Sequence, residues 1–270
     1  MLVLYNNHIL EEEGIIIFFI IFLIFAIFAS LCFKLLLYFG VSSILSGIIS
    51  FIIYIVCCYM YLYIKSNIQS NILDEDCDPE RFLKLIDRQD RKSRKTQRYM
   101  NYIAINRAAG HMSLGDCKAA KEYLDEVDTT YLSEKDNSYL VYTMNMIGCY
   151  YALGEIEKAE VLYETNMVRF CPYIKKLKKS VEILIGERYY YLKKYNLSYE
   201  HLQKLLNYEL TKRQYLGVLY CLAQMDVRNG DKEQATVKFK KIAKLGNKLW
   251  ISKDSKEMIE NIKTIQVIQE

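Results

Sequence analysis

Histidine and cysteine are the side chains that most often bind metal ions or act as nucleophiles. The three histidines, His8, His111 and His201, lie far apart, and none stands at ligand spacing from a cysteine or from another histidine. The eight cysteines follow no regular spacing, and Cys57 and Cys58 lie inside an apolar run. We therefore expect no metal site and no cofactor, and free thiols in a reducing compartment rather than disulfides.

Carboxylates and nucleophiles give no clear catalytic set. The acids 11–13 and the pair Glu155 and Glu157 could do acid–base chemistry, but surface acids at helix starts explain them better, because they interact favourably with the helix dipole. No glycine-rich phosphate loop follows a predicted strand, and serine, histidine and aspartate occur only at ordinary helical and turn positions. We expect a protein that is not an enzyme.

Tyrosine is unusually frequent, with 24 copies in 270 residues. Runs such as Tyr150-Tyr151 and Tyr189-Tyr190-Tyr191 could stack on a ligand or line a groove with their hydroxyls exposed, which would suit peptide recognition. The alternative is that these rings pack between neighbouring helices. We expect most of them to pack between helices, and a binding groove lined by the others remains the alternative.

Two basic patches could attract an anionic partner. The second runs from Lys175 to Lys179, and the first and densest consists of Arg88, Arg91, Lys92, Arg94, Lys95 and Arg98. Anionic lipid head groups are one interpretation, because each base near a membrane surface contributes about 1 kcal/mol. A solvated helix face is the other. Nucleic acid is not expected as a partner, since acids are interleaved with the bases.

The elements that would position these side chains fall into two unlike parts. Up to Lys65 the chain carries only three acids and two bases, which leaves 34 bases and 29 acids for residues 66–270. Two prolines and eleven glycines in the whole chain argue against an all-β protein, whose many turns would call for more of both. The sequence therefore predicts an all-α fold.

The first part predicts a membrane hairpin. Ile15 to Phe33 is a run of nineteen residues without a charge, and at 1.5 Å per residue it covers a hydrocarbon core of about 30 Å. A second run spans 44–64. We expect an N-terminal tail (1–14), a transmembrane hairpin (15–64, with helices at about 15–37 and 42–64) and a polar linker (65–78). A re-entrant hairpin, or one pass plus a buried helix, remains open.

The flanking charges predict the orientation of the hairpin. A cleavable signal peptide would begin with basic residues, whereas this chain opens with none and carries three acids at 11–13. The basic cluster at 88–98 favours a cytoplasmic side for the region after the hairpin, although Lys34 in the turn argues weakly the other way. We expect a cell-membrane protein with two passes and both termini in the cytoplasm.

The second part contains an internal repeat. The turn glycines Gly115, Gly154 and Gly230 are each followed five residues later by alanine, at Ala120, Ala159 and Ala235, and then by a large residue, at Leu124, Tyr163 and Phe239. The first two glycines are 39 residues apart and the last two 76, so a further unit is expected near residue 193. Gly186, Tyr189, Tyr190, Ser198 and Leu202 supply the same offsets there.

This pattern resembles the tetratricopeptide repeat family, in which a Gly and an aromatic pair in one helix precede a Gly-acid turn and an Ala-aromatic pair in the next. The residues that carry the resemblance are Gly115, Ala120, Tyr150, Tyr151, Gly154, Ala159, Tyr163, Gly186, Tyr189, Tyr190, Ser198, Gly230, Ala235 and Phe239. It covers roughly 97–243, with units 37–39 residues apart rather than the family's usual 34, and so implies lengthened loops such as 129–137. The resemblance implies an α-solenoid of helix-turn-helix repeats over 79–270, closed by a capping helix at 252–268.

The combination of anchor and repeats predicts a protein–protein interaction adaptor or scaffold held at a membrane. Its expected partners are a protein or peptide, cytoplasmic or part of a membrane complex, bound by the repeats, and membrane lipid. The alternative is a membrane-linked signalling or regulatory protein, whose hairpin senses a membrane event that the repeats transmit.

Overall fold

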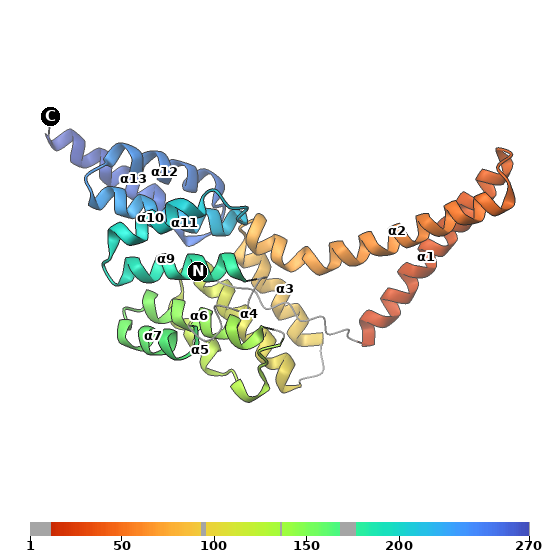
Figure 1. Ribbon diagram of the computed structural model, residues 1–270, viewed down its shortest axis with the longest axis horizontal. Helices are drawn as coiled ribbons and strands as arrows, with labels where there is room; N and C mark the ends of the chain where they lie inside the picture. Colours follow the sequence, from red (N-terminus) through yellow and green to blue (C-terminus); the bar gives the residue numbers. More distant parts are fainter. Residues whose placement is uncertain (1–11, 93–95, 136, 168–176, 270) are drawn as a thin grey trace. The chain divides into compact units, whose positions relative to one another are not determined.

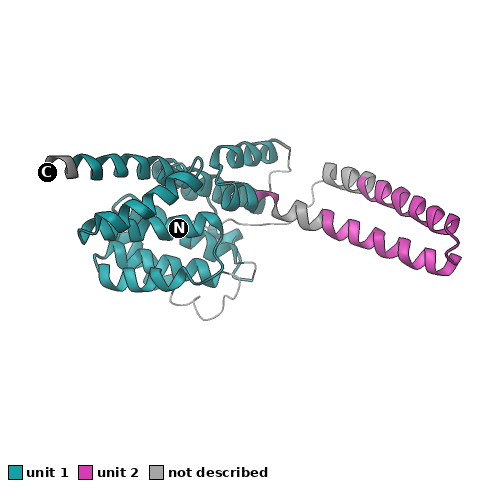
Figure 2. Cartoon of the chain, turned by 90° about the horizontal axis from the view of Figure 1, so that it is seen from above, with its two compact units in different colours: residues 1–6, 70–270 teal, residues 7–69 magenta. Residues whose placement is uncertain are grey.

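The predicted all-α class is confirmed. The computed structural model describes residues 12–92, 96–135, 137–167 and 177–269, and within these ranges it contains helices and turns but no strand (Figure 1). The chain divides into two compact units whose boundary lies between residues 69 and 70 (Figure 2). In chain order, we call the hairpin the first unit (magenta, unit 2 in the key of Figure 2) and the helical part from residue 70 the second unit (teal, unit 1 in the key).

The first unit contains two long apolar helices, α1 (Glu12–Tyr38) and α2 (Ser43–Ser70). Gly40 lies in the turn between them with a φ of +79°, a left-handed conformation that glycine adopts without strain. Within the described residues both helices contain a stretch long and apolar enough to cross a membrane, over 21–38 and 43–61. Both helices are longer than the predicted 15–37 and 42–64, since hydrophobicity marks the membrane-length part of a helix and not its ends.

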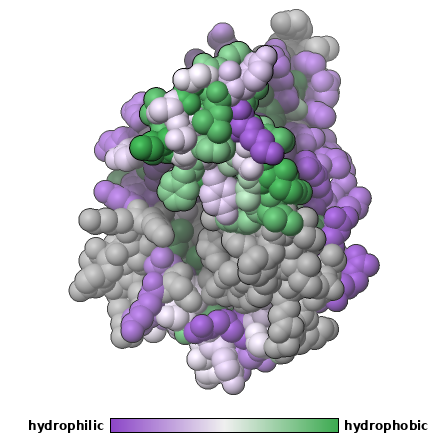
Figure 3. All heavy atoms as spheres, turned by 90° about the vertical axis from the view of Figure 1, so that its right-hand side faces the viewer, coloured by the Kyte–Doolittle hydropathy of each residue, from purple (hydrophilic) through white to green (hydrophobic). Residues whose placement is uncertain are grey.

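Aromatic rings connect these two helices: the rings of Phe22 and Tyr54 lie edge-on with centroids 6.4 Å apart, and those of Phe25 and Tyr61 at 6.3 Å. Ala29, Ser46 and Ser50 are buried, whereas many of the larger apolar side chains are exposed; Leu23 and Ile44, for example, are 61% and 78% exposed. Figure 3 looks onto the turn end of the hairpin and shows hydrophobic side chains gathered on its described surface.

The predicted polar linker at 65–78 is mostly helical instead. Helix α2 continues to Ser70 and passes directly into η1 (Asn71–Glu75), a π-helical segment. Polarity alone does not end a helix, and neither glycine nor proline occurs between Lys65 and Pro79. Ile72 and Leu73 are buried, so this segment is packed rather than solvated.

Helices of the second unit pack as consecutive pairs. The first helices of the pairs are α4 (Gln97–Ser113), α6 (Ser138–Ala152), α9 (Lys178–Tyr191) and α11 (Lys212–Arg228). The second helices are α5 (Cys117–Asp125), α7 (Ile156–Leu162) with η3 (Tyr163–Met167), α10 (Tyr195–Leu205) and α12 (Lys232–Leu245). Each first helix contacts its own second helix, and α4, α6, α9 and α11 also contact one another in that order (Figure 1).

The four turns inside the pairs share one geometry. Gly115, Gly154, Lys193 and Gly230 all have a positive φ, between +60° and +86°. In each turn the amide of this residue donates to the carbonyl three residues before it, and the next amide donates to the carbonyl five residues before itself. This is the Schellman motif, which satisfies the last carbonyls of a helix. The unit expected from spacing near residue 193 is therefore present, with lysine in place of glycine.

The small residues of the repeat pattern lie where the two helices of a pair meet. Ala120, Ala159, Ser198 and Ala235 are all fully buried. The large residues four positions later are buried as well, at Leu124, Tyr163, Leu202 and Phe239. A helix repeats its face at this spacing, so each second helix presents a small and a large side chain to its partner.

Two further helices flank the pairs. Helix α3 (Pro79–Lys92) packs on α4, and α13 (Trp250–Gln269) packs on α12. Asp78 caps α3, because its side chain accepts a hydrogen bond of 3.0 Å from the amide of Arg81. Helix α13 contains the predicted capping segment 252–268; Ile259 and Ile262 are buried, and the side chains of Ile265 and Ile268 lie outside the described residues.

Helix α4 begins at Gln97, because the side chain of Thr96 caps it by accepting a hydrogen bond of 3.3 Å from the amide of Tyr99. The loop expected at 129–137 contains a short 3₁₀ helix, η2 (Thr129–Tyr131).

Candidate functional site

A cavity of about 410 Å³ lies among the first helices of the four pairs and the start of α13. Its lining comes from five parts of the chain: Met112, Ser113, Cys117, Gly148, Ala152, Ile183, Glu187, Tyr190, Tyr191, Arg213, Gln214, Gly217, Tyr220, Cys221, Gln224, Leu249, Trp250 and Ile251. Cavities of this size accommodate small ligands or single side chains of a bound peptide.

Gly217 forms part of the wall that α11 contributes. Among the described residues, no heavy atom lies within 4 Å of a Cβ built on this glycine. Glycine inside a helix costs about 1 kcal/mol relative to alanine, and no positive φ requires it here. The residue therefore leaves open space beside the α11 backbone.

Aromatic rings form much of the remaining wall. The rings of Tyr220 and Trp250 are nearly perpendicular, at 71° with centroids 5.1 Å apart, and make a corner. The hydroxyl of Tyr220 donates to Asp254 Oδ2 at 2.6 Å and accepts from Gln224 Nε2 at 2.9 Å. Burial and the carboxylate of Asp254 raise the pKa of Tyr220 far above its usual value, so the phenol stays neutral.

The lining carries one acidic and one basic side chain, Glu187 and Arg213. Arg213 is almost fully buried, and its Nε and one terminal nitrogen lie 2.8 and 2.7 Å from Asp74 Oδ1. Its charge is thus balanced by a carboxylate outside the lining. Glu187 stands one turn before Tyr190 and Tyr191 on α9, and therefore on the same face of that helix.

Asp74 belongs to a group of contacts that we call the clasp, which joins residues 74–80 to the start of α11 and to residues 247–248. Lys212 donates to the carbonyl of Glu75, and Asn247 Nδ2 donates to the carbonyl of Asp76 at 2.9 Å. Lys248 pairs with Asp78 at 3.2 Å and with Glu80 at 2.9 Å. The clasp therefore joins the first residues of the second unit to its last helices.

Cysteine thiols lie at both the cavity and the clasp. Each cysteine of the described ranges is a free thiol, and Cys171 lies outside those ranges. Burial, with a smaller contribution from Glu187, raises the pKa of Cys221 in the cavity wall to about 12. Cys77 is fully buried within the clasp, and burial raises its pKa to about 11. Such thiols are poor nucleophiles at neutral pH.

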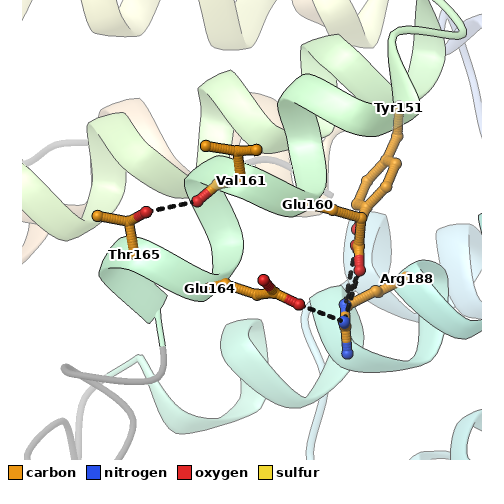
Figure 4. A network of polar contacts seen from close by, with 6 residues as sticks. All are labelled: Tyr151, Glu160, Val161, Glu164, Thr165 and Arg188. Carbon is orange, nitrogen blue, oxygen red and sulfur yellow. Dashed lines mark hydrogen bonds and ion pairs between the residues drawn. The ribbon is translucent and has the colours of Figure 1, made fainter.

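A polar network joins the second and third pairs beside the cavity (Figure 4). Arg188 of α9 holds Glu160 of α7 with Nε at 2.9 Å from one carboxylate oxygen and a terminal nitrogen at 2.5 Å from the other. The hydroxyl of Tyr151 donates to the same carboxylate. The ring of Tyr151 stacks on Tyr191 of the cavity wall, with centroids 4.8 Å apart and an angle of 3°. These contacts fix the position of one cavity residue.

The tyrosines of the repeat pattern occupy different environments. Tyr151 and Tyr163 are buried between helices, whereas Tyr190 lines the cavity. Tyr189 lies edge-on to His201, with centroids 6.1 Å apart. Tyr150 is half-buried, with Lys121 and Lys158 over its ring. Packing between helices therefore accounts for Tyr151 and Tyr163, and Tyr190 contributes to the wall of the cavity.

The first basic patch is described only in part. Arg88 and Arg91 of α3 and Arg98 of α4 are exposed. Arg94, Lys95 and the side chain of Lys92 lie outside the described residues, as do Lys175 and Lys176 of the second patch. Within the described ranges, histidine, cysteine, aspartate and glutamate side chains form no group of three or more that could hold a metal ion.

Sequence reasoning missed most of the cavity residues. Glu187, Arg213, Tyr220 and Trp250 belong to no motif, and only the tertiary structure brings them together. One signal was present in the sequence: Gly217 stands inside an otherwise regular helical pattern, and such a glycine often marks a packing or functional requirement.

Comparison with known proteins gives no relative: no protein-family model, no curated protein and no solved structure matches this chain.

Proposed function

We propose that this chain is a membrane-anchored adaptor or scaffold that binds a segment of a partner protein in the cavity of its helical unit. The hairpin is the anchor, and the cavity is the binding site. The observation that carries the proposal is the cavity itself, because all four first helices contribute to one concave, largely aromatic and apolar lining.

The properties of α1 and α2 support the anchor. Many of their large apolar side chains are exposed, the opposite of a soluble helix pair, which would bury its large apolar side chains. In this proposal the protein spans the cell membrane twice, and both termini and the helical unit lie in the cytoplasm.

The four equivalent turns support a tetratricopeptide-like solenoid. Stacked pairs of that kind expose a concave face built from the first helices, which is where peptides are often bound. The four first helices of this chain line one cavity, in agreement with that arrangement. The proposed partner is a peptide or helix from a cytoplasmic protein or a membrane complex.

A photo-crosslinking residue in place of Gly217 tests the binding site in the native membrane. Its side chain would enter the open space beside α11. We expect crosslinks from this position to a discrete protein, and their loss when Cys117, another residue of the lining, is replaced by tryptophan. The matched control is the same residue at Val237, an exposed position on α12. Identical products from both positions would refute binding in the cavity.

Membrane lipid is the second proposed partner, through the basic patch that includes Arg88, Arg91 and Arg98. In lipid nanodiscs containing anionic lipid, trypsin should cleave after these arginines more slowly than in neutral discs. High salt should remove the difference, because it screens exposed charges. Equal cleavage in both kinds of disc would contradict a lipid contact.

A membrane-linked signalling protein remains the second candidate, favoured by one observation. Arg213 both lines the cavity and pairs with Asp74, and Asp74 lies in the helical segment that continues directly from α2. An event at the hairpin could therefore alter the cavity. If an unrelated two-helix anchor preserved function in cells, this candidate would fail and the adaptor would stand.

A further inference from the structure

We infer that the bound segment anchors itself with an uncharged apolar side chain, of about the size of leucine or phenylalanine, which enters the cavity beside Gly217. Charged side chains are disfavoured there. The inference rests on the proposed function, since it names the chemistry of the partner that the cavity takes.

Polar side chains of the lining already have partners within the protein. The amide of Gln214 uses both of its ends, because Nε2 donates to Ser180 Oγ at 3.2 Å and Oε1 accepts from the amide of Thr211 at 3.2 Å. The hydroxyl of Tyr220 likewise donates one hydrogen bond and accepts another. A polar group of a ligand would lose its hydrogen bonds to water and gain few from these side chains.

The charged side chains of the lining are engaged as well. Arg213 pairs with Asp74 at 2.7 Å, and Glu187 has an interaction of its own within the protein. Burial raises the pKa of Tyr191 and of Cys221, so both stay uncharged at neutral pH. An ionic ligand would therefore compete with existing contacts and would also lose its hydration in surroundings that disfavour charge.

Apolar groups supply the rest of the wall. Met112, Ile183, Leu249 and Ile251 line the cavity, and each is buried within the protein. Beside them Gly217 leaves open space along the backbone of α11, since no heavy atom of the described residues lies within 4 Å of a Cβ built there. An apolar side chain that fills this space leaves water and gains contacts with these walls.

The chain itself places an apolar segment against the same helices. This segment is Leu249, Trp250 and Ile251, at the start of α13. The ring of Trp250 lies edge-on to Tyr220 of α11, with centroids 5.1 Å apart. Its Cβ lies 3.0 Å from the position that a Cβ on Gly115, in the turn after α4, would occupy. Helix α11 and the turn after α4 thus already accept apolar side chains, and the cavity continues that surface.

Trp250 makes the test direct, because the chain contains only one tryptophan and it lies in the cavity wall. The full-length chain in detergent micelles is titrated with the N-acetyl amides of leucine, lysine and glutamate. We expect a saturable change in Trp250 fluorescence with the leucine probe, and an affinity at least about tenfold lower for both charged probes. Equal or tighter binding of a charged probe would overturn the inference.

A filled cavity is the control for probe that dissolves in the micelle. Gly217→Leu places an apolar side chain in the open space and should abolish the saturable response, whereas Val237→Leu at an exposed position of α12 should keep it. Circular dichroism of each variant shows that it is folded. A response that persists in Gly217→Leu, or no saturable response in the folded wild type, would contradict an apolar site in the cavity.

Substitutions of Gly217 also test the preference without a free ligand. Leucine, lysine and glutamate replace Gly217 and, as references for helix propensity, Val237. After correction by the references, Gly217→Leu should unfold at a higher urea concentration than Gly217→Lys and Gly217→Glu, because only its side chain suits apolar walls. No advantage of Gly217→Leu over the charged variants would refute the preference.

These results are independent of the crosslinking experiment at Gly217. Leucine binding without crosslinks would keep the apolar site and refute the adaptor. Crosslinks together with tighter binding of a charged probe would keep the adaptor and refute the apolar site.

Discussion

The hydroxyl of Ser198 donates a hydrogen bond of 2.8 Å to the backbone carbonyl of Gly186, across the contact between α9 and α10. Both residues were selected from the sequence as members of the same repeat unit. The bond requires the two helices to approach closely, and a Cβ built on Gly186 would lie 2.3 Å from Leu202 Cδ2. The glycine and the serine are therefore parts of one contact.

Gly186→Ala should destabilise the protein by about 1–3 kcal/mol, because the added methyl group overpacks the contact with Leu202. Gly217→Ala in the neighbouring first helix should have the opposite effect and stabilise by up to about 1 kcal/mol, since its Cβ enters open space. Urea unfolding of the two variants measures the difference. Destabilisation of equal size in both would show that the space around these glycines does not decide the outcome.

Asp74→Asn should destabilise the helical unit by about 3 kcal/mol, because it removes the carboxylate that pairs with the buried Arg213. It should also expose Cys77, which is fully buried in the clasp. The measurement is the rate of alkylation of Cys77, followed by mass spectrometry of its peptide. Asp76→Asn is the matched control, since that carboxylate is exposed and pairs at the surface with Arg81. Equal alkylation rates in the two variants would contradict a closed clasp.

Glu160→Gln should cost about 1–3 kcal/mol at neutral pH, because it weakens the network with Arg188 and Tyr151. Burial would raise the pKa of Glu160, but hydrogen bonds from Arg188 and Tyr151 outweigh it and hold this pKa below its usual 4.5. A lowered folded pKa means that the stabilisation is present above the unfolded pKa and is lost as pH falls through the folded one.

The difference in stability between wild type and Glu160→Gln should therefore shrink below about pH 4.5. Urea unfolding at a series of pH values measures it. Glu164→Gln is the control, because Glu164 is 4.0 Å from Arg188 and mostly exposed, and this change should have little effect at any pH. A constant difference across the series would show that the charge of Glu160 is not what stabilises the network.

Ionisation of the buried thiols of Cys77 and Cys221 should reduce the stability of the folded protein at alkaline pH. Their pKa values in the folded state are about 11 and about 12, above the usual value of 9. A raised pKa of a thiol means that its stabilising effect is complete below the unfolded pKa and is lost as pH rises towards the folded one. The melting temperature should fall above about pH 9, and it should fall less in Cys77→Ala than in wild type. An identical decline in both would contradict a contribution from Cys77.

The parts of the fold that depend on local sequence could be predicted. The turn at Lys193 was expected only from the spacing of the glycines, and it is present because the buried positions at Ser198 and Leu202 keep the same offsets. The capping of α3 by Asp78 follows from residues three positions apart. Both rest on interactions within one or two helical turns.

The parts of the fold that depend on contacts between residues far apart in the sequence could not be predicted. Asp74 and Arg213 are 139 residues apart, and no local pattern marks either as a member of a pair. The same holds for the cavity, whose walls come from helices spread over most of the second unit. The segment at 65–78 was interpreted as a linker because it is polar, although its buried Ile72 and Leu73 pack against other helices.

The clasp also sets an order for the folding of the chain during its synthesis. Chains are synthesised from the N-terminus, and domains fold as they emerge. Residues 12–70, which form α1 and α2, leave the ribosome before the rest of the described chain. The ion pair between Glu80 and Lys248 can form only after another 168 residues have been added beyond Glu80. The nascent chain thus completes its apolar hairpin long before the clasp can form, and closure of the clasp marks a nearly finished helical unit.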